Sequence, residues 1–193
     1  VTSIGEYAFL GCTSIKSVNI PSSVATINTN AFSGCSALSQ FFVESTTTHI
    51  DDTALAGCTR LTSGKYGSLE WSRDKEKNSL TFSNGGTLHP LPWLAQAFEA
   101  KSIIIGAGVT ILETNALKGF TSVEDITFTD SVETLKSGAL PNLSNLKSIT
   151  LGSGVTEIEP SAFSGCVSLA TISLSDGNES FMLDNGVLYT KDK

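Results

Sequence analysis

Hydrophobic and small residues recur along the chain at a fixed step of 23 residues. The clearest marker is the series Cys12, Cys35 and Cys58. The same step relates Ile4, Ile27 and Ile50, and also Ala8, Ala31 and Ala54. A constant period in the twenties indicates a stack of one supersecondary unit, in which each unit covers the hydrophobic face of the next. The pattern therefore predicts a solenoid, and it lowers the expectation of an enzyme built around one pocket.

The pattern inside one period predicts four short pieces of structure. Val18 and Ile20 alternate with polar neighbours, which is typical of a short strand. Pro21 then ends the strand, and Ile27 belongs to a second short apolar edge. Residues 28–34 end in glycine and predict a brief turn of helix. One coil is thus expected to hold a strand, a turn, a second edge and a helical turn.

The repeat divides the chain into two arrays. The first covers residues 1–66 and the second covers residues 101–174. The step of 23 is kept in the second array by Val109, Val132 and Val155. Residues 67–100 fall outside the period and are interpreted as an insertion between the arrays.

The insertion predicts a β-hairpin followed by a short helix. Residues 69–72 and 80–83 alternate between apolar and polar side chains, and a charged run, Arg73 to Lys77, separates them. The segment from Pro92 onward predicts a helix with proline in its first turn, and Leu94 and Phe98 would face the array. We interpret residues 67–100 as a cap or a decorated repeat, with a ligand site beneath them as the alternative.

The two ends of the chain suggest a piece of a longer protein. Residues 175–193 contain Asp184-Asn185-Gly186 between apolar runs, which predicts the start of a C-terminal hairpin or spacer. Its partner strand is expected to be missing, and the chain opens at Val1 in mid-repeat. The sequence thus predicts a truncated tail and a trimmed start.

Charge and hydropathy exclude several classes of partner. The chain carries 19 acidic and 12 basic residues, a net charge of −7. Nucleic-acid binding needs clustered lysine and arginine, and the sequence has no such cluster. An anionic membrane surface is disfavoured for the same reason. No run approaches the ~20 apolar residues that span a bilayer, so no membrane insertion is expected within this fragment.

The four cysteines could form two disulfides, but the repeat favours free thiols. In the second array the cysteine position is occupied by Phe120, then Leu143, then Cys166. A position that accepts all three residue types is an apolar socket. Adjacent coils would still place Cys12 and Cys35 within bonding reach, so geometry alone does not forbid a bridge.

Catalytic and metal-binding patterns are weak. The histidines His49 and His89 are not spaced as metal ligands, and paired Cys-x-x-Cys motifs are absent. Asp51 and Asp52 beside His49 could support acid–base or metal chemistry, but they are interpreted as a solvated loop. The sequence has no phosphate-binding loop and no nucleophile elbow. We therefore expect no metal and no cofactor.

Specific stretches resemble a known repeat family. The segments from Cys12 to Cys35 and from Val155 to Cys166 resemble the 23-residue leucine-rich repeat of BspA-like bacterial and protozoan surface proteins. Leu69-Glu-Trp71 and Pro92-Trp93 resemble an element that precedes the arrays in some members. The segment 184–189 resembles a spacer between arrays.

The resemblance implies both a fold and a location. The fold class is α/β: a leucine-rich repeat solenoid, coiled in a right-handed sense, with a parallel sheet on one face and here an inserted β-hairpin and short helix. The location is extracellular or at the cell surface. Adhesion to host matrix proteins or to other bacteria is known for some members.

The outward face of the sheet is the candidate ligand-contact surface. With Val18 and Ile20 inward, the alternate side chains of each strand point outward. The residues selected on this face are Asn19, Gln40, Phe42, Lys65, Ile104, Asp125, Thr127 and Thr150. Phe42 is an expected anchor for a protein partner. The alternative is that Phe42 packs under the insertion or a neighbouring coil.

The sequence thus predicts a non-enzymatic binding module whose partner is a macromolecule such as a host matrix protein, a glycoprotein or another cell surface. The first alternative is a structural spacer that displays other domains of a longer surface protein. A third is an enzyme sited at the 67–100 insertion, near Trp71, Trp93 and His89.

Overall fold

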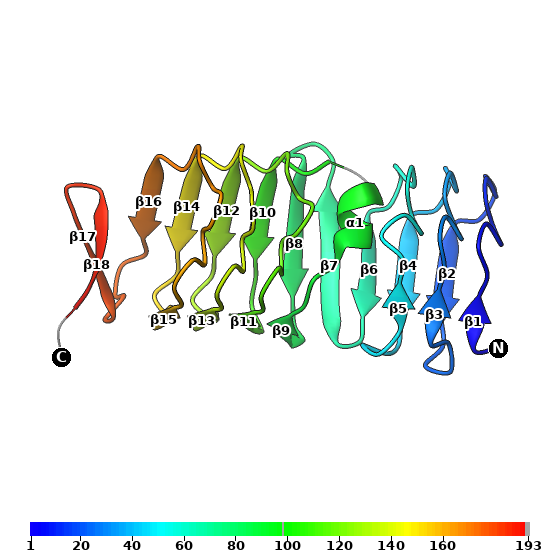
Figure 1. The fold of residues 1–193 in the computed structure, drawn as a ribbon, viewed down its shortest axis with the longest axis horizontal. Helices are drawn as coiled ribbons and strands as arrows, with labels where there is room; N and C mark the ends of the chain where they lie inside the picture. The colour runs from blue at the N-terminus through cyan, green and yellow to red at the C-terminus, as the bar shows by residue number, and fades with distance from the viewer. Residues whose placement is uncertain (98, 192–193) are drawn as a thin grey trace.

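One long sheet runs through the whole molecule, with the two termini at opposite ends of the stack (Figure 1). The computed structural model describes residues 1–97 and 99–191. Within these ranges nine strands form this sheet, in the spatial order β2 (Ser17–Ile20), β4 (Gln40–Val43), β6 (Ser63–Tyr66), β7 (Leu69–Asp74), β8 (Ser79–Ser83), β10 (Ser102–Ile105), β12 (Asp125–Phe128), β14 (Ser148–Leu151) and β16 (Thr171–Leu174).

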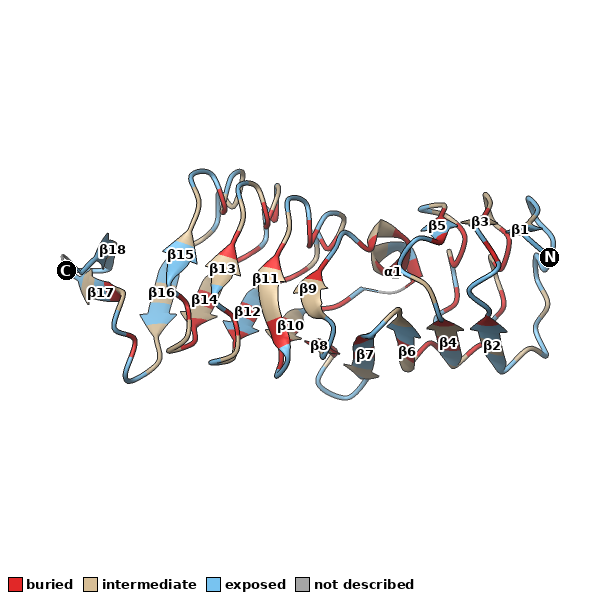
Figure 2. Cartoon of the chain, turned by 90° about the horizontal axis from the view of Figure 1, so that it is seen from below, coloured by how far each residue is buried: buried red, intermediate tan, exposed pale blue. Residues whose placement is uncertain are grey.

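The 23-residue period is the register of the parallel strands. Ile103 on β10 pairs with Ile126 on β12, and Ile126 pairs with Ile149 on β14. All three side chains are buried, because alternate residues of each strand point into the coil. Equivalent side chains therefore stack on one another and form a continuous core behind the sheet, visible as the buried positions of Figure 2.

Shorter strands form a second edge behind the long sheet. One group is β1 (Ser3–Ile4), β3 (Thr26–Ile27) and β5 (His49–Ile50); the other is β9 (Gly86–Leu88), β11 (Val109–Leu112), β13 (Thr134–Leu135) and β15 (Glu157–Ile158). Both groups are parallel. In the described chain no strand pairing joins β5 to β9, so the second edge is interrupted where the long sheet is continuous.

The helical turns expected in each coil are wrong; these segments are hydrogen-bonded turns. The N–H of Phe32 donates to the carbonyl of Ala54 in the next coil, at 2.8 Å, instead of to a carbonyl four residues earlier. The N–H of Gly34 likewise donates to Ala56, at 2.8 Å. Because these donors bond between coils, the segment stays a turn. Among the described residues α-helix is confined to α1 (Pro92–Ala97).

An antiparallel strand joins the two halves of the sheet. β7 runs antiparallel to both β6 and β8, and two reversals restore the common direction. We call β6, β7 and β8 the splice. The predicted hairpin is β7 and β8, and the predicted helix is α1, although Phe98 lies outside the described residues.

The period resumes within the splice. Leu80 and Phe82 on β8 pair with Ile103 and Ile105 on β10, one full period later. The sequence places these residues in the insertion, because their repeat is followed by a helix instead of the usual turn. The limits 1–66, 67–100, 101–174 and 175–193 remain predictions for domain boundaries.

Gly64 and Trp71 form the centre of the splice. They are partners across β6 and β7, and Trp71 pairs in turn with Phe82. The Trp71 side chain is 2% exposed, and a Cβ at Gly64 would overlap the Trp71 indole and the Phe41 carbonyl oxygen. The indole thus occupies the inward space that a side chain fills at the equivalent position of other coils, Val18 or Phe41.

The C-terminal hairpin is complete within the chain, so the expectation of a missing partner strand is wrong. β17 (Phe181–Asp184) pairs antiparallel with β18 (Val187–Thr190). Asn185 and Gly186 both have positive φ, 50° and 80°, which gives the two-residue turn that brings the second strand back at once. Phe181 is buried against the core and covers this end of the stack.

The cysteines are free thiols, as predicted. Three of the thiols donate a hydrogen bond to a backbone carbonyl of the preceding coil. Cys35 donates to Phe9 at 3.1 Å, Cys58 to Phe32 at 3.1 Å and Cys166 to Leu140 at 3.3 Å. The cysteine position is therefore an apolar socket with one carbonyl acceptor.

Candidate ligand-binding face

The register places the eight predicted contact residues on the outward side of the long sheet, in three rows. Asn19, Phe42 and Lys65 are neighbours in one row across β2, β4 and β6. A second row begins with Gln40, crosses the splice, and continues through Ile104, Thr127 and Thr150. Asp125 belongs to a third row, between Ser102 and Ser148.

These eight residues differ in exposure. Five of them are exposed: Asn19, Gln40, Lys65, Asp125 and Thr127. Phe42, Ile104 and Thr150 are half-buried. The eight therefore share one side of the sheet but are spread along its length, and their role in binding stays a prediction.

The splice adds outward side chains that the sequence analysis did not select. Glu70 and Ser72 come from β7, and Thr81 and Ser83 come from β8. Glu70 is the direct partner of Lys65, and Ser83 is the direct partner of Glu70. The alternation of residues 69–72 marked a hairpin, but nothing in it showed that the hairpin lies within the main sheet. That placement makes Glu70 a neighbour of Lys65.

A depression of about 350 Å³ lies on this face at the splice, and we call it the splice pit. It is lined by Phe42, Ser63, Gly64, Lys65, Glu70, Trp71, Ser72 and Ser83. Gly64 and Trp71 are buried and lie at its base, whereas the serines leave room because their side chains are short. Phe42 supplies the aromatic side of the pit.

Two opposite charges line the splice pit without pairing within the described residues. Lys65 and Glu70 are both exposed, and neither forms an ion pair or a side-chain hydrogen bond in that part of the chain. Their backbones are adjacent across β6 and β7, about 5 Å apart. The pit therefore offers a cationic donor and an anionic acceptor side by side.

Charges in the second array are used differently. Glu124 accepts a hydrogen bond at 2.8 Å from Lys101, one coil earlier, and another from Lys147, one coil later. These hydrogen bonds and the two positive charges lower the pKa of Glu124 to about 2. Lys136 pairs with Glu159 at 2.8 Å in the same way. Because equivalent positions stack at each period, these charges connect coils.

Phe42 is neither fully covered nor isolated. It pairs with Asn19 and Lys65 in adjacent strands, and it stays half-buried beside the splice pit. Glu70 and Ser83 of the insertion line the same pit, but Lys65 lies between them and Phe42, and part of the Phe42 side chain stays accessible. The role of Phe42 as an anchor for a partner stays a prediction.

The residues considered for catalysis do not converge on one cleft. Trp71 and Trp93 are core side chains, 2% and 3% exposed, and the Trp93 ring lies 5.8 Å from that of Phe41. His89 is exposed. Asp51 accepts hydrogen bonds from the backbone N–H and hydroxyl of Thr53, which lower its pKa and close a local turn. Within the described residues, no group of three or more His, Cys, Asp or Glu could hold a metal ion.

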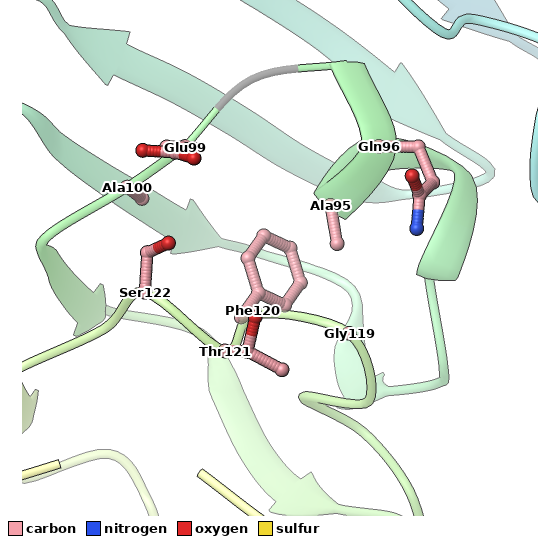
Figure 3. Close-up of a pocket in the computed structure, with 8 residues that line it drawn as sticks. All are labelled: Ala95, Gln96, Glu99, Ala100, Gly119, Phe120, Thr121 and Ser122. Carbon is pink, nitrogen blue, oxygen red and sulfur yellow. The ribbon is translucent and has the colours of Figure 1, made fainter. Parts of the chain in front are cut away.

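A second depression, of about 280 Å³, lies between α1 and the turn of residues 119–122 (Figure 3). The Phe120 ring faces the gap between Ala95 and Ser122, and Gln96 points away from it. Glu99 is the titratable residue in its lining. A single carboxylate without a partner base gives this depression no evident acid–base chemistry.

Comparisons with known proteins agree with this architecture. A family model described as a BspA type leucine-rich repeat region matches in six copies, over residues 1–72 and 95–184. The internal segment that the family model leaves unmatched, residues 73–94, contains the end of β7, the β7–β8 turn, β8, β9 and the start of α1. No curated protein matches the sequence.

Solved structures of leucine-rich repeat proteins are also similar. The pneumococcal vaccine antigen PcpA is 15% identical, with 86% of this chain and 52% of that chain covered and a TM-score of 0.44. A leucine-rich repeat protein from Bacteroides ovatus is 26% identical, with coverage of 91% and 41% and a TM-score of 0.43. A leucine-rich cell surface protein from Faecalibacterium prausnitzii is 17% identical, with coverage of 91% and 70% and a TM-score of 0.26. The chain spans about half the length of the first two.

None of the described helical residues forms a helix long and apolar enough to cross a membrane. The family model covers well over half of the chain in six copies, and the 23-residue step of the sequence is the register observed between the strands. The chain belongs to the BspA-type leucine-rich repeat family.

Proposed function

We propose that this chain is a non-enzymatic binding module of a secreted or cell-surface protein, and that the outward face of its long sheet contacts a partner protein. Leucine-rich repeat folds of this type are commonly used for protein binding. Membership of the BspA-type family supports the location, since the family resemblance implies export.

One observation carries the proposal: the outward face is continuous across nine strands although the repeat is interrupted at the splice. The second edge is interrupted at the same place, so the splice preserves this face of the coil and not the opposite one. Most outward residues are small and polar, with one partly accessible aromatic residue, Phe42. Such a face can lie against a large partner, and Phe42 provides the kind of anchor that dominates interface energy.

The test is binding of the purified protein to immobilised matrix proteins and to whole cells, measured by surface plasmon resonance and by cell attachment. Lys65→Ala on the outward face should weaken binding, whereas Lys118→Ala, an exposed lysine in a turn, should leave it unchanged. Phe42→Ala should have the larger effect, about tenfold or more in Kd if the ring is an anchor. Equal effects of the two lysine variants would contradict the assignment of the face.

The spacer remains the competing function. It predicts that this chain binds none of the panel while other domains of the full-length protein do. Attachment of cells to the full-length protein but not to this region would therefore favour the spacer.

A further inference from the structure

We propose that the splice pit binds a saccharide, with one pyranose ring packed against Phe42 and its hydroxyl groups bonded to Lys65 and Glu70. This inference rests on the proposed function, because it names the chemical group that the outward face recognises. A glycan of a glycoprotein or of a cell surface is the expected source.

The shape of the pit is a consequence of the splice. In a regular coil, each outward residue is followed one strand later by its own repeat equivalent, so the face keeps the same profile. At the splice, Lys65 is followed by Glu70 and then by Ser83, none of which are 23 residues apart. Gly64 and Trp71 lie at the base with no outward side chain of their own. The resulting space of about 350 Å³ lies in the range typical of small-ligand sites.

The polar groups of the pit match the chemistry of a sugar. The Lys65 ammonium can only donate hydrogen bonds, the ionised Glu70 carboxylate can only accept them, and serine hydroxyls do both. A pair of neighbouring sugar hydroxyls can accept from the ammonium and donate to the carboxylate at the same time. Ser63, Ser72 and Ser83 surround these two charged groups and accommodate further hydroxyls.

The apolar part of the pit matches the remaining face of the ring. Phe42 is half-buried and its neighbours in the row, Asn19 and Lys65, are exposed. The face of an aromatic ring carries partial negative charge, so the weakly positive C–H groups of a pyranose pack favourably against it. A sugar therefore has a complement for both the aromatic and the polar sides of the pit.

Charge balance argues against ionic ligands. Lys65 and Glu70 have opposite charges on directly paired positions, so a simple anion or cation would meet one attractive and one repulsive charge. A zwitterionic amino acid matches the two charges but leaves the three serines without a designated partner. A neutral ligand rich in hydroxyl groups uses all of these residues.

The experiment measures saturation-transfer NMR with the intact chain and millimolar methyl pyranosides of glucose, galactose, mannose and N-acetylglucosamine, with leucine and glycine as zwitterionic probes. At least one pyranoside should show transfer to its ring C–H protons. Phe42→Ala and Glu70→Gln should each raise its Kd about tenfold or more. The first removes the stacking surface, and the second removes the negative charge and replaces one accepting carboxylate oxygen with an NH2 group that can only donate. Lys118→Ala, in an exposed turn outside the outward face, should change nothing.

A second arm separates free sugar from glycoprotein. The chain is exposed to an immobilised mucin before and after enzymatic removal of its glycans. Loss of binding after deglycosylation supports a glycan partner, and competition by the active pyranoside places that glycan in the pit.

Several outcomes would contradict the proposal that the splice pit binds a saccharide. They are the absence of transfer to every pyranoside, transfer that Phe42→Ala and Glu70→Gln leave unchanged, and transfer to the amino acids alone. If protein partners still bind through the outward face in those cases, the proposed function stands and only the saccharide is wrong. If pyranosides bind but no macromolecule is retained, the pit stands and the proposed adhesion fails.

Discussion

The regular coils and the splice solve the same packing problem with different sequences. In the regular coils, Ile103, Ile126 and Ile149 stack at equivalent positions, and each strand is covered by a copy of itself. In the splice, Gly64 lies opposite Trp71. At this pair of positions β6 contributes no side chain, and β7 contributes the largest one. The first solution tolerates exchange of similar residues, whereas the second depends on a matched pair.

This difference separates two kinds of information in the chain. Repetition specifies the fold, because any coil can pack on any other in the same register. The exception creates local shape and chemistry, because only at the splice do Lys65 and Glu70 meet beside a depression. Charges of the regular coils, such as Glu124 with Lys101 and Lys147, instead connect one coil to the next.

The largest effect is expected for Trp71→Ala. Removing a buried tryptophan typically costs about 3–5 kcal/mol of unfolding free energy. Gly64 has no side chain to fill the space left by the indole, so the packing between the two arrays is weakened. In a repeat protein, a weakened interface reduces cooperativity. Denaturant unfolding followed by circular dichroism should therefore change from one transition to two.

Phe128→Ala is the matched control for this variant. Phe128 is buried to a similar degree but belongs to a regular coil. We expect a comparable loss of stability, located within the second array. A single sharp transition in Trp71→Ala, with a loss below that of Phe128→Ala, would show that the splice is not the weak junction.

A smaller effect is expected for Gly64→Ala. The added Cβ would overlap the Phe41 carbonyl oxygen and the Trp71 indole, so the backbone or the indole must move. Overpacking of this kind usually costs about 1–3 kcal/mol. Gly5→Ala is the control, since nothing lies within 4 Å of a Cβ built there. Thermal unfolding should show a lower Tm for the first variant and little change for the second.

The sequence predicts the coils better than the splice, for a physical reason. The period of 23 fixed the register of the strands, and the exchange of Cys58, Phe120 and Leu143 at one position correctly indicated an apolar socket. The prediction of a helical turn at residues 28–34 was wrong, because N–H groups of this segment donate hydrogen bonds to carbonyls of the next coil. A local sequence pattern does not show a hydrogen-bond partner that is so distant in the chain.

The candidate site was predictable only in part. The alternation of each strand showed that Phe42 and Lys65 face outward. It did not show that Glu70 is the cross-strand partner of Lys65. That pairing requires β7 to lie antiparallel beside β6, and this placement depends on Trp71 filling the space at Gly64. That dependence is a tertiary contact between two strands, and no periodic signal marks it.

The smallest expected effect concerns the cysteine position next to the splice. Burial raises the pKa of the Cys58 thiol from 9.0 to about 12, and Cys58 is fully buried. Between pH 9 and 12 the unfolded chain releases this proton while the folded chain retains it. The folded state then binds more protons, so the unfolding free energy falls as pH rises through this window. Cys58→Ala should remove that part of the alkaline loss of stability.

Cys166 provides the comparison with a regular coil. It occupies the same repeat position but is half-buried, whereas Cys58 is fully buried, and burial raises the pKa of Cys166 too. As the pH rises from 8 to 11, the difference in unfolding free energy between wild type and Cys58→Ala should therefore shrink. The difference between wild type and Cys166→Ala should shrink less. Equal slopes for the two variants would mean that the coil beside the splice excludes water no better than a coil near the end of the stack.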